Sequence, residues 1–197
     1  MKRANISVIV LVLSLFICCT PESGNGQKVS AINTTEVKKT TVESKVIPDR
    51  LDDEKEFRKL FKTLNENLKK KNINGLAALM NFPFYTSHAE LDNGMGAASD
   101  PISKTEFKNY KNLIFNHDVL RLLPHCREDN LSEIDEKTTE IYYKTLKKLT
   151  DPGSKMYEVY MQYPESNTQA ESFFGFVFGR VNSQFKTIAT YAKWPVK

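Results

Sequence analysis

The sequence predicts an α+β fold in which N-terminal helices pack on a curved, cone-like antiparallel sheet. From residue 50 onward, apolar residues first recur at helical spacing and later, over 156–192, alternate with polar residues as in strands. Helices followed by a run of strands are typical of the α+β class. Gly175 and Gly179 interrupt a phenylalanine-rich strand and predict a bend or bulge, which would curl the sheet.

Residues 1–19 have the features of a bacterial lipoprotein signal peptide: a basic start, an apolar run over 6–17 and a terminal pair of cysteines. The apolar run is shorter than the roughly 20 residues of a transmembrane helix. Lipid attachment at Cys18 would place Leu15 three residues before it, whereas attachment at Cys19 would place a small residue directly before it. We expect Cys19 to be modified, with Cys18 as the alternative. An ordinary secreted protein and an uncleaved N-terminal anchor are the other interpretations.

Residues 20–49 contain no aromatic residue and are rich in polar ones, which predicts a flexible polar linker. Residues 50–197 then form a single predicted domain, with enough apolar residues for a packed core. The formal net charge is +4 at pH 7, and basic residues are spread among acidic ones, so we expect no nucleic-acid partner. After processing at Cys19, Cys126 would be the one free thiol, and we expect it to be a small buried hydrophobic residue.

Two helices open the predicted domain. A helix over 52–70 is indicated by apolar residues at intervals of three and four, namely Phe57, Leu60, Phe61, Leu64 and Leu68. Asn72 can cap a second, short helix whose apolar side carries Leu76, Leu79 and Met80. Pro83 makes 82–86 an edge strand or the start of a strand. The glycines and proline of 87–101 predict a loop or an irregular hairpin.

Ser103 and Glu106 form a predicted capping box, because each side chain can accept a backbone N–H at the start of a helix. The helix that follows carries Phe107, Tyr110 and Ile114 on one side. Asp118 is the predicted cap of a turn at 119–123. Residues 132–149 are predicted to form another helix, with an inward side made of Ile134, Ile141, Tyr142, Leu146 and Leu149.

Three strands complete the predicted fold, at 156–163, 171–180 and 185–192. In the first of them, Tyr157, Val159, Met161 and Tyr163 alternate with Glu158, Tyr160 and Gln162. Asn182-Ser183-Gln184 is predicted to join the last two strands in a tight hairpin.

Three local segments resemble the nuclear-transport-factor-like, or SnoaL-like, superfamily, in particular its small exported bacterial lipoproteins. They are Leu-Ala-Ala-Leu-Met-Asn-Phe-Pro-Phe at 76–84, Pro-Ile-Ser-Lys-Thr-Glu-Phe at 101–107 and Ile-Ala-Thr-Tyr at 188–191. The resemblance covers 52–192 and implies a cystatin-like cone of curved sheet around helices. It implies no particular activity, because the superfamily contains isomerases, dehydratases and binding modules. Enzymes of this superfamily use an acidic pair or a His–Asp dyad. Neither can be matched position by position to residues of this sequence.

The candidate catalytic and metal-binding residues are few, since the chain has only three histidines, His88, His117 and His125. His117 and Asp118 are adjacent, and neighbours on a helix point about 100° apart, which argues against a dyad. The spacing of His117, His125 and Cys126 fits no standard zinc site. Gly94-Met95-Gly96 lacks the lysine and helix start of a phosphate loop. We therefore expect no catalytic residue, no metal and no cofactor.

Aromatic residues on the predicted sheet would fill the core on one face and could line an apolar pocket with polar tips on the other. The candidate ligand-binding residues are Tyr85, His88, Tyr157, Tyr160 and Arg180. Glu158 is a further candidate polar contact at the mouth of such a pocket.

The favoured role is a lipid-anchored, non-catalytic module of the bacterial cell envelope that binds a small apolar ligand or a protein partner. Thr20 is not the aspartate associated with inner-membrane retention, which favours the outer membrane, at its periplasmic or surface face. One alternative is a small cofactor-free enzyme of the SnoaL-like kind, catalysing isomerase- or hydratase-type proton transfer. Another is a structural envelope protein that works as a homodimer.

Overall fold

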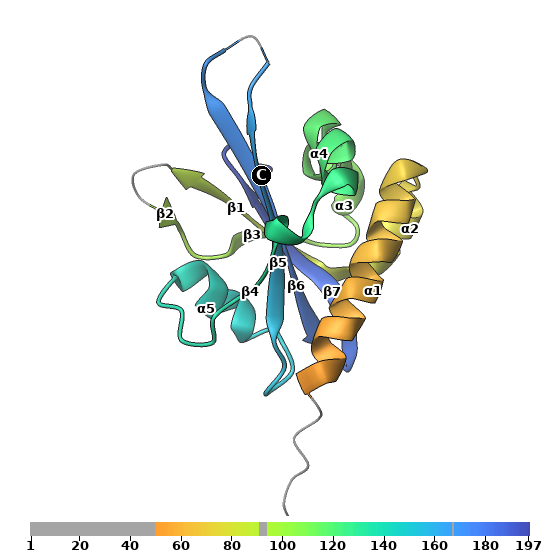
Figure 1. Cartoon of the computed structure of the whole chain (residues 1–197), viewed down its shortest axis with the longest axis vertical. Helices are drawn as coiled ribbons and strands as arrows, with labels where there is room; N and C mark the ends of the chain where they lie inside the picture. Colours follow the sequence, from red (N-terminus) through yellow and green to blue (C-terminus); the bar gives the residue numbers. More distant parts are fainter. Residues whose placement is uncertain (1–49, 91–93, 167) are drawn as a thin grey trace, which may run out of the picture. The chain divides into compact units, whose positions relative to one another are not determined.

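The computed structural model describes residues 50–90, 94–166 and 168–197, without the side chains of 50–52, 88–90 and 94 (Figure 1). The predicted signal peptide and linker, residues 1–19 and 20–49, lie outside the described residues. Within the described ranges, no helix has both the length and the apolar character of a membrane span.

The helices at the start of the domain follow the sequence prediction. Helix α1 (Arg50–Lys69) is followed by α2 (Ile73–Leu79), where the side-chain oxygen of Asn72 accepts the Gly75 N–H at 3.1 Å. The predicted capping box precedes α3 (Phe107–Ile114). The Ser103 N–H donates to Glu106 Oε2 at 2.9 Å, and the Glu106 N–H donates to Ser103 Oγ at 3.2 Å. These local signals were sufficient because a cap acts within one helical turn.

The cap of α4 (His117–Leu122) is Asn116, so the predicted capping role of Asp118 is wrong. The Asn116 side chain accepts the backbone N–H groups of Asp118 and Val119, both at 3.0 Å. Asp118 lies in the first turn of the helix and instead accepts a hydrogen bond from Arg121 at 2.8 Å. Two short 3-10 helices, η1 (Leu123–His125) and η2 (Glu128–Asn130), follow α4.

The predicted helix over 132–149 is also wrong. Its first part is strand β4 (Leu131–Glu133), and only Ile141–Lys147 form a helix, α5. Strand β4 pairs with the strand that contains Glu158, and the Ile134 N–H donates to the Met156 carbonyl at 2.9 Å. These contacts join residues far apart in the sequence, and they override the local apolar spacing. Because α5 begins only at Ile141, this residue is 61% exposed and not inward-facing as predicted.

The remaining strands are β1 (Met80–Glu90), β2 (Gly94–Met95), β3 (Ser99–Ile102), β5 (Met156–Pro164), β6 (Glu171–Val181) and β7 (Gln184–Ala192). In the described residues they form a sheet in the order β2-β1-β7-β6-β5-β4, with β3 also paired to β1. Strands β1 and β7 are parallel, and the other pairs are antiparallel. The sheet is therefore mixed, because one of its strand pairs is parallel. Strands β2 and β3 both pair with the preceding strand β1, which gives the irregular hairpin predicted for 87–101.

Strand β1 is longer than predicted and is not an edge strand, because it has neighbours on both sides. Pro83 is accommodated by a register shift in the β1–β7 pairing between Met80 and Tyr85. An irregularity of this kind tolerates the missing N–H of proline. The predicted bulge near Gly175 and Gly179 is present, since the β6–β7 register shifts between Val177 and Phe178.

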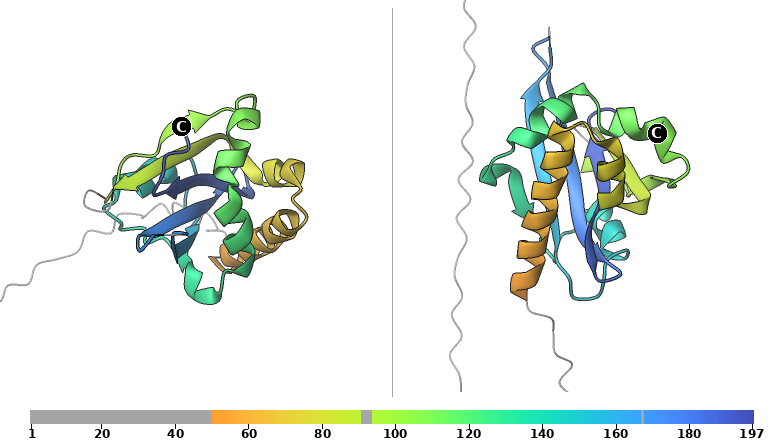
Figure 2. Two further views of the ribbon diagram at one scale, coloured as in Figure 1. Left: turned by 90° about the horizontal axis from the view of Figure 1, so that it is seen from above. Right: turned by 90° about the vertical axis from the view of Figure 1, so that its right-hand side faces the viewer.

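The sheet is covered on both faces, with α1 to α4 on one side and α5 on the other (Figures 1 and 2). The helix-side core lies under α1 to α4 and includes Phe57, Leu64, Leu76, Ile114, Val159 and Phe176. The α5-side core includes Tyr142, Leu146, Met156, Val177 and Tyr191. The predicted α+β class, with helices packed on a curved sheet, is confirmed.

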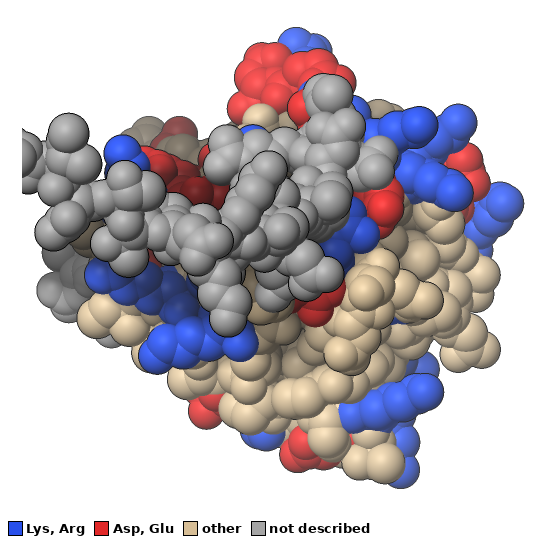
Figure 3. Space-filling model, turned by 90° about the horizontal axis from the view of Figure 1, so that it is seen from below, with Lys and Arg blue, Asp and Glu red and all other residues tan. Residues whose placement is uncertain are grey.

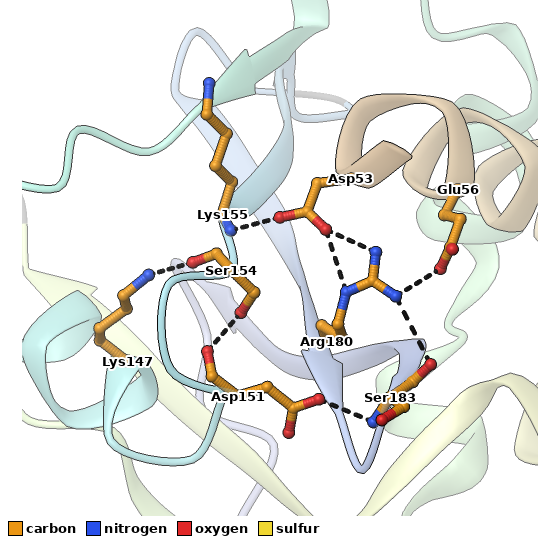
Figure 4. A network of polar contacts seen from close by, with 8 residues as sticks. All are labelled: Asp53, Glu56, Lys147, Asp151, Ser154, Lys155, Arg180 and Ser183. Atoms are coloured by element: carbon orange, nitrogen blue, oxygen red, sulfur yellow. Dashed lines mark hydrogen bonds and ion pairs between the residues drawn. The ribbon is translucent and has the colours of Figure 1, made fainter. Parts of the chain in front are cut away.

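A polar network ties the start of α1 to the end of the sheet where β6 turns into β7 (Figure 4). Arg180 Nη2 lies 2.5 Å from Asp53 Oδ1, and Asp53 Oδ2 accepts the Lys155 N–H at 2.7 Å. Arg180 also pairs with Glu56 at 3.0 Å. Asp53 is buried, so its charge depends on these contacts for compensation.

Replacing Asp53 by alanine should lower the free energy of unfolding by about 3 kcal/mol, because it leaves Arg180 without its closest partner. Glu54→Ala is the matched control, since Glu54 pairs with Arg58 at an exposed position and should cost less than about 1 kcal/mol. Urea unfolding of the two variants measures the difference. Equal losses would mean that the Asp53 contacts contribute no more than a surface ion pair.

Candidate functional site

The structure places the predicted ligand-binding residues on different parts of the sheet. Tyr157 faces the helix-side core and stacks on Phe57, with ring centroids 4.6 Å apart. Tyr85 and Tyr160 pack against the α5-side core, and Arg180 belongs to the ion-pair network. His88 lies in β1 opposite Ala192, and its side chain is outside the described residues. The four residues whose side chains are described, Tyr85, Tyr157, Tyr160 and Arg180, therefore do not line a common wall.

The interior beneath α1 to α4 is filled by aromatic rings. The buried ones are Phe57, Phe61, Phe84, Phe107, Phe115, Tyr157, Phe174, Phe176, Phe178 and Phe185. An open groove of about 550 Å³ lies between α1 and residues 126–131, and a cavity of about 120 Å³ lies between α3, α4 and the C-terminal residues. Leu113 and Trp194, which are 51% and 63% exposed, border the cavity. The cavity is smaller than the roughly 300 Å³ at which typical ligand pockets begin.

A carboxylate surrounded by hydroxyl groups lies on the other face, beside α5. Glu158 Oε2 accepts hydrogen bonds from the hydroxyls of Tyr143 at 2.6 Å and Tyr191 at 3.0 Å. Glu158 Oε1 accepts one from Ser132 Oγ at 3.2 Å. These four residues, the Glu158 cluster, come from α5, β7, β4 and β5. The sequence indicated Glu158 as a polar contact but not its three partners.

Gly175 allows Tyr191 to reach Glu158 across an intervening strand. Gly175 in β6 is paired with Tyr191 on one side and with Tyr160 on the other. The Tyr191 ring lies directly over it, so that a β-carbon at position 175 would be 2.2 Å from Tyr191 Cζ. Tyr160 and Tyr191 stack beyond the glycine, with centroids 6.4 Å apart. Gly175 was predicted to bend the strand, and the structure shows that it also leaves the space occupied by the Tyr191 ring.

The tyrosines of the cluster are neutral hydrogen-bond donors. Burial, with the nearby Glu158 charge, raises the pKa of Tyr143 and of Tyr191 far above the ordinary value. Burial likewise raises the pKa of Tyr142, whose ring packs edge-on against both of these tyrosines. A neutral tyrosine donates one proton, and here that proton is directed at the carboxylate.

Next to the cluster is a cavity of about 350 Å³ between α5 and the segment that connects it to β4. Its apolar floor is made by Ile134, Tyr143 and Met156. The rest of this α5 pocket is lined by Asp135, Glu136, Thr138, Lys144, Lys147 and Lys148. Tyr143 belongs to both the pocket and the Glu158 cluster, so one side chain links the apolar floor to the carboxylate.

The candidate histidine and cysteine chemistry does not gather at a site. His117 is 87% exposed, and its Nδ1 is 3.6 Å from Asp118 Oδ1, closer than the helical geometry predicts but beyond a normal hydrogen bond. Burial raises the pKa of the half-buried Cys126 thiol to about 11, which disfavours a nucleophilic thiolate. Within the described part of the chain, no three His, Cys, Asp or Glu side chains are grouped as a metal site.

On one face of the molecule, the surface charges are mixed in sign. Viewed from below, lysine and arginine side chains are interspersed with acidic ones around a broad uncharged area (Figure 3). The described part of this one face shows no single-sign stripe of the kind that is typical of nucleic-acid-binding surfaces.

No protein-family model and no curated protein matches the sequence. The chain is similar to solved structures of low sequence identity. One is an NTF2-like protein of unknown function from Pseudomonas putida KT2440, with 11% identity and a TM-score of 0.38 over 75% of this chain and 89% of that chain. Another is an uncharacterized protein with a cystatin-like fold from Caulobacter vibrioides, with 10% identity and a TM-score of 0.35 over 72% and 88%.

A third similar structure is a putative calcium/calmodulin dependent protein kinase II association domain from Xanthomonas campestris. It has 17% identity and a TM-score of 0.31, over 70% of this chain and 84% of that chain. The NTF2-like and cystatin-like descriptions match the predicted resemblance to the nuclear-transport-factor-like superfamily. The similarity concerns the fold, and no function follows from it.

Replacing Gly175 by alanine should displace the Tyr191 ring and destabilise the protein by about 1–3 kcal/mol, as overpacking does. Gly96→Ala is the matched control, because a β-carbon there meets no atom within 4 Å. Urea unfolding gives the energies. Adding Tyr191→Ala to Gly175→Ala should remove the clash, so the combined loss should be smaller than the sum. Additive losses would contradict the contact.

Proposed function

We propose that this protein is a lipid-anchored, non-catalytic binding module of the bacterial cell envelope that holds a small apolar molecule in the α5 pocket. The observation that carries the proposal is the pocket itself. Its volume of about 350 Å³ falls within the usual range for small-molecule sites, and its floor is apolar.

The state of the neighbouring polar groups supports binding over catalysis. Glu158 already accepts three hydroxyl hydrogen bonds, and Tyr143 and Tyr191 stay neutral. A general base should instead have a lone pair that is free to accept the proton of a substrate. The interior beneath α1 to α4, where the enzymatic alternative would place its reaction, is occupied by aromatic side chains.

A protein partner is the second candidate for the same region. Ile141, at the start of α5, is 61% exposed and would supply an apolar contact beside the pocket. A partner that covers α5 would bury this side chain. The small molecule remains the favoured ligand because the pocket is concave.

The location in the envelope is supported by the N-terminal sequence. A basic start, an apolar run and the pair Cys18-Cys19 are typical of lipoprotein signals. The polar segment 20–49 would separate the lipid from the domain. Anchoring to the outer membrane is the favoured arrangement, since Thr20 follows Cys19.

Decanol should bind in the α5 pocket and shift the methyl resonance of Met156, because this side chain forms part of the floor. The chain labelled with methyl-¹³C methionine provides internal controls, since Met80 and Met161 lie in or against the helix-side core. NMR titration measures the shifts. Shifts at Met80 or Met161 with none at Met156 would place the ligand elsewhere and contradict the proposed site.

A clickable fatty-acid label should be incorporated into the chain in a bacterial host and be lost in Cys19→Ser, because the cysteine sulfur is the acceptor. Cys126→Ser is the control and should keep the label. The mass of the mature N-terminus identifies the register. Loss of label in Cys18→Ser alone would assign the lipid to Cys18, and an unlabelled wild-type chain would contradict lipid attachment.

A further inference from the structure

The mouth of the α5 pocket is charged on two opposing walls. Helix α5 supplies Lys144 and Lys147, the C-cap residue that follows it is Lys148, and the segment between β4 and α5 supplies Asp135 and Glu136. The apolar floor lies between these walls. A ligand that fills the floor would therefore present its remaining end to lysine and carboxylate side chains.

Two of these charged groups are already engaged by the protein. The Lys147 ammonium donates a hydrogen bond to the Ser154 carbonyl (Figure 4). Asp135 Oδ1 accepts the Lys137 N–H at 2.8 Å, which stabilises the turn before α5. The side chains of Lys147 and Asp135 therefore each hold a nearby backbone group.

Lys144 and Lys148 are exposed and take part in none of the ion pairs found among the residues that the structure describes. Lys148 is the C-cap residue of α5 and keeps a helical backbone, so it lies one turn after Lys144 on the same side of the helix. Hydrogen bonds to neutral backbone groups leave the charges of Asp135 and Lys147 in place. Three lysines and two carboxylates line the pocket, so its charged lining is net positive.

We propose that the ligand of the α5 pocket is a single-chain amphiphile with an acidic group, whose apolar part lies on Ile134, Tyr143 and Met156 and whose anion contacts Lys144 and Lys148. This inference rests on the proposed function of the same pocket. Glu158 does not itself line the pocket, and Tyr143, which does, donates its hydroxyl to the carboxylate.

The test compares three probes with the same apolar chain, each below its micelle-forming concentration: decanoate, decanol and decyltrimethylammonium. Binding to the full chain is followed by the Met156 methyl shift. Decanoate should bind at least about threefold more tightly than the other two, as expected for two partly exposed ion pairs. High salt should reduce this preference.

The double variant Lys144→Ala/Lys148→Ala should weaken decanoate binding by a factor of about 3 to 10 and leave decanol binding unchanged. Lys104→Ala/Lys108→Ala is the matched control, because these lysines are exposed and do not line the pocket. If α5 depends on its lysines for stability, Lys144→Gln/Lys148→Gln keeps the length of both side chains while removing the charge.

The outcomes separate the two proposals. Equal affinity for decanoate and decanol, or a preference for decyltrimethylammonium, would overturn the acidic-ligand inference but leave the apolar pocket. Absence of a Met156 shift with all three probes would overturn the proposed function itself. A shift caused by anionic phosphatidylglycerol vesicles but not by decanoate would assign the acidic group to membrane lipid and overturn the single-chain ligand.

Discussion

Strand β5 directs Tyr157 towards helix α1 and Glu158 towards helix α5, so the register of this strand decides what lies on each face of the sheet. Side chains alternate along a strand, and a shift of one residue would place the Glu158 charge among aromatic rings. Pairing with β4 and β6 fixes the register, and so does the Asp53 carboxylate, which accepts the N–H of Lys155 just before the strand. The helix-side core and the Glu158 cluster therefore depend on the same constraint.

The Glu158 cluster depends on a second, steric condition. A side chain normally contacts the nearest strand, yet Tyr191 in β7 reaches Glu158 in β5 across β6. Only the absence of a side chain at Gly175 leaves room for the ring. Tyr143 approaches the same carboxylate from α5. The cluster thus joins the sheet to the one helix that covers this face in the described residues.

The parts of the fold that could be predicted are those encoded by neighbouring residues. Alternation indicated the last three strands, and the Ser103–Glu106 box indicated a helix start, because both signals act over a few positions. The helix over 132–149 was predicted wrongly because apolar spacing there is compatible with a helix, whereas pairing with β5 is a long-range effect. Long-range contacts also decide which residues meet at the candidate site. Alternation within one strand indicated Glu158 and Tyr160, but no local pattern indicated that Tyr143 and Tyr191 contact Glu158.

The hydrogen bonds of Glu158 also determine what the neighbouring pocket can do. An ionised carboxylate next to apolar surface is costly unless donors compensate it, and here three hydroxyls from three separate elements do so. An apolar ligand can then occupy the floor without removing hydration on which Glu158 depends. Tyr143 supplies ring surface to the pocket and its proton to the carboxylate, so it separates the charge from the ligand. The polar contacts left for a ligand are consequently the charged side chains that line the rest of the pocket, at α5 and on the segment before it.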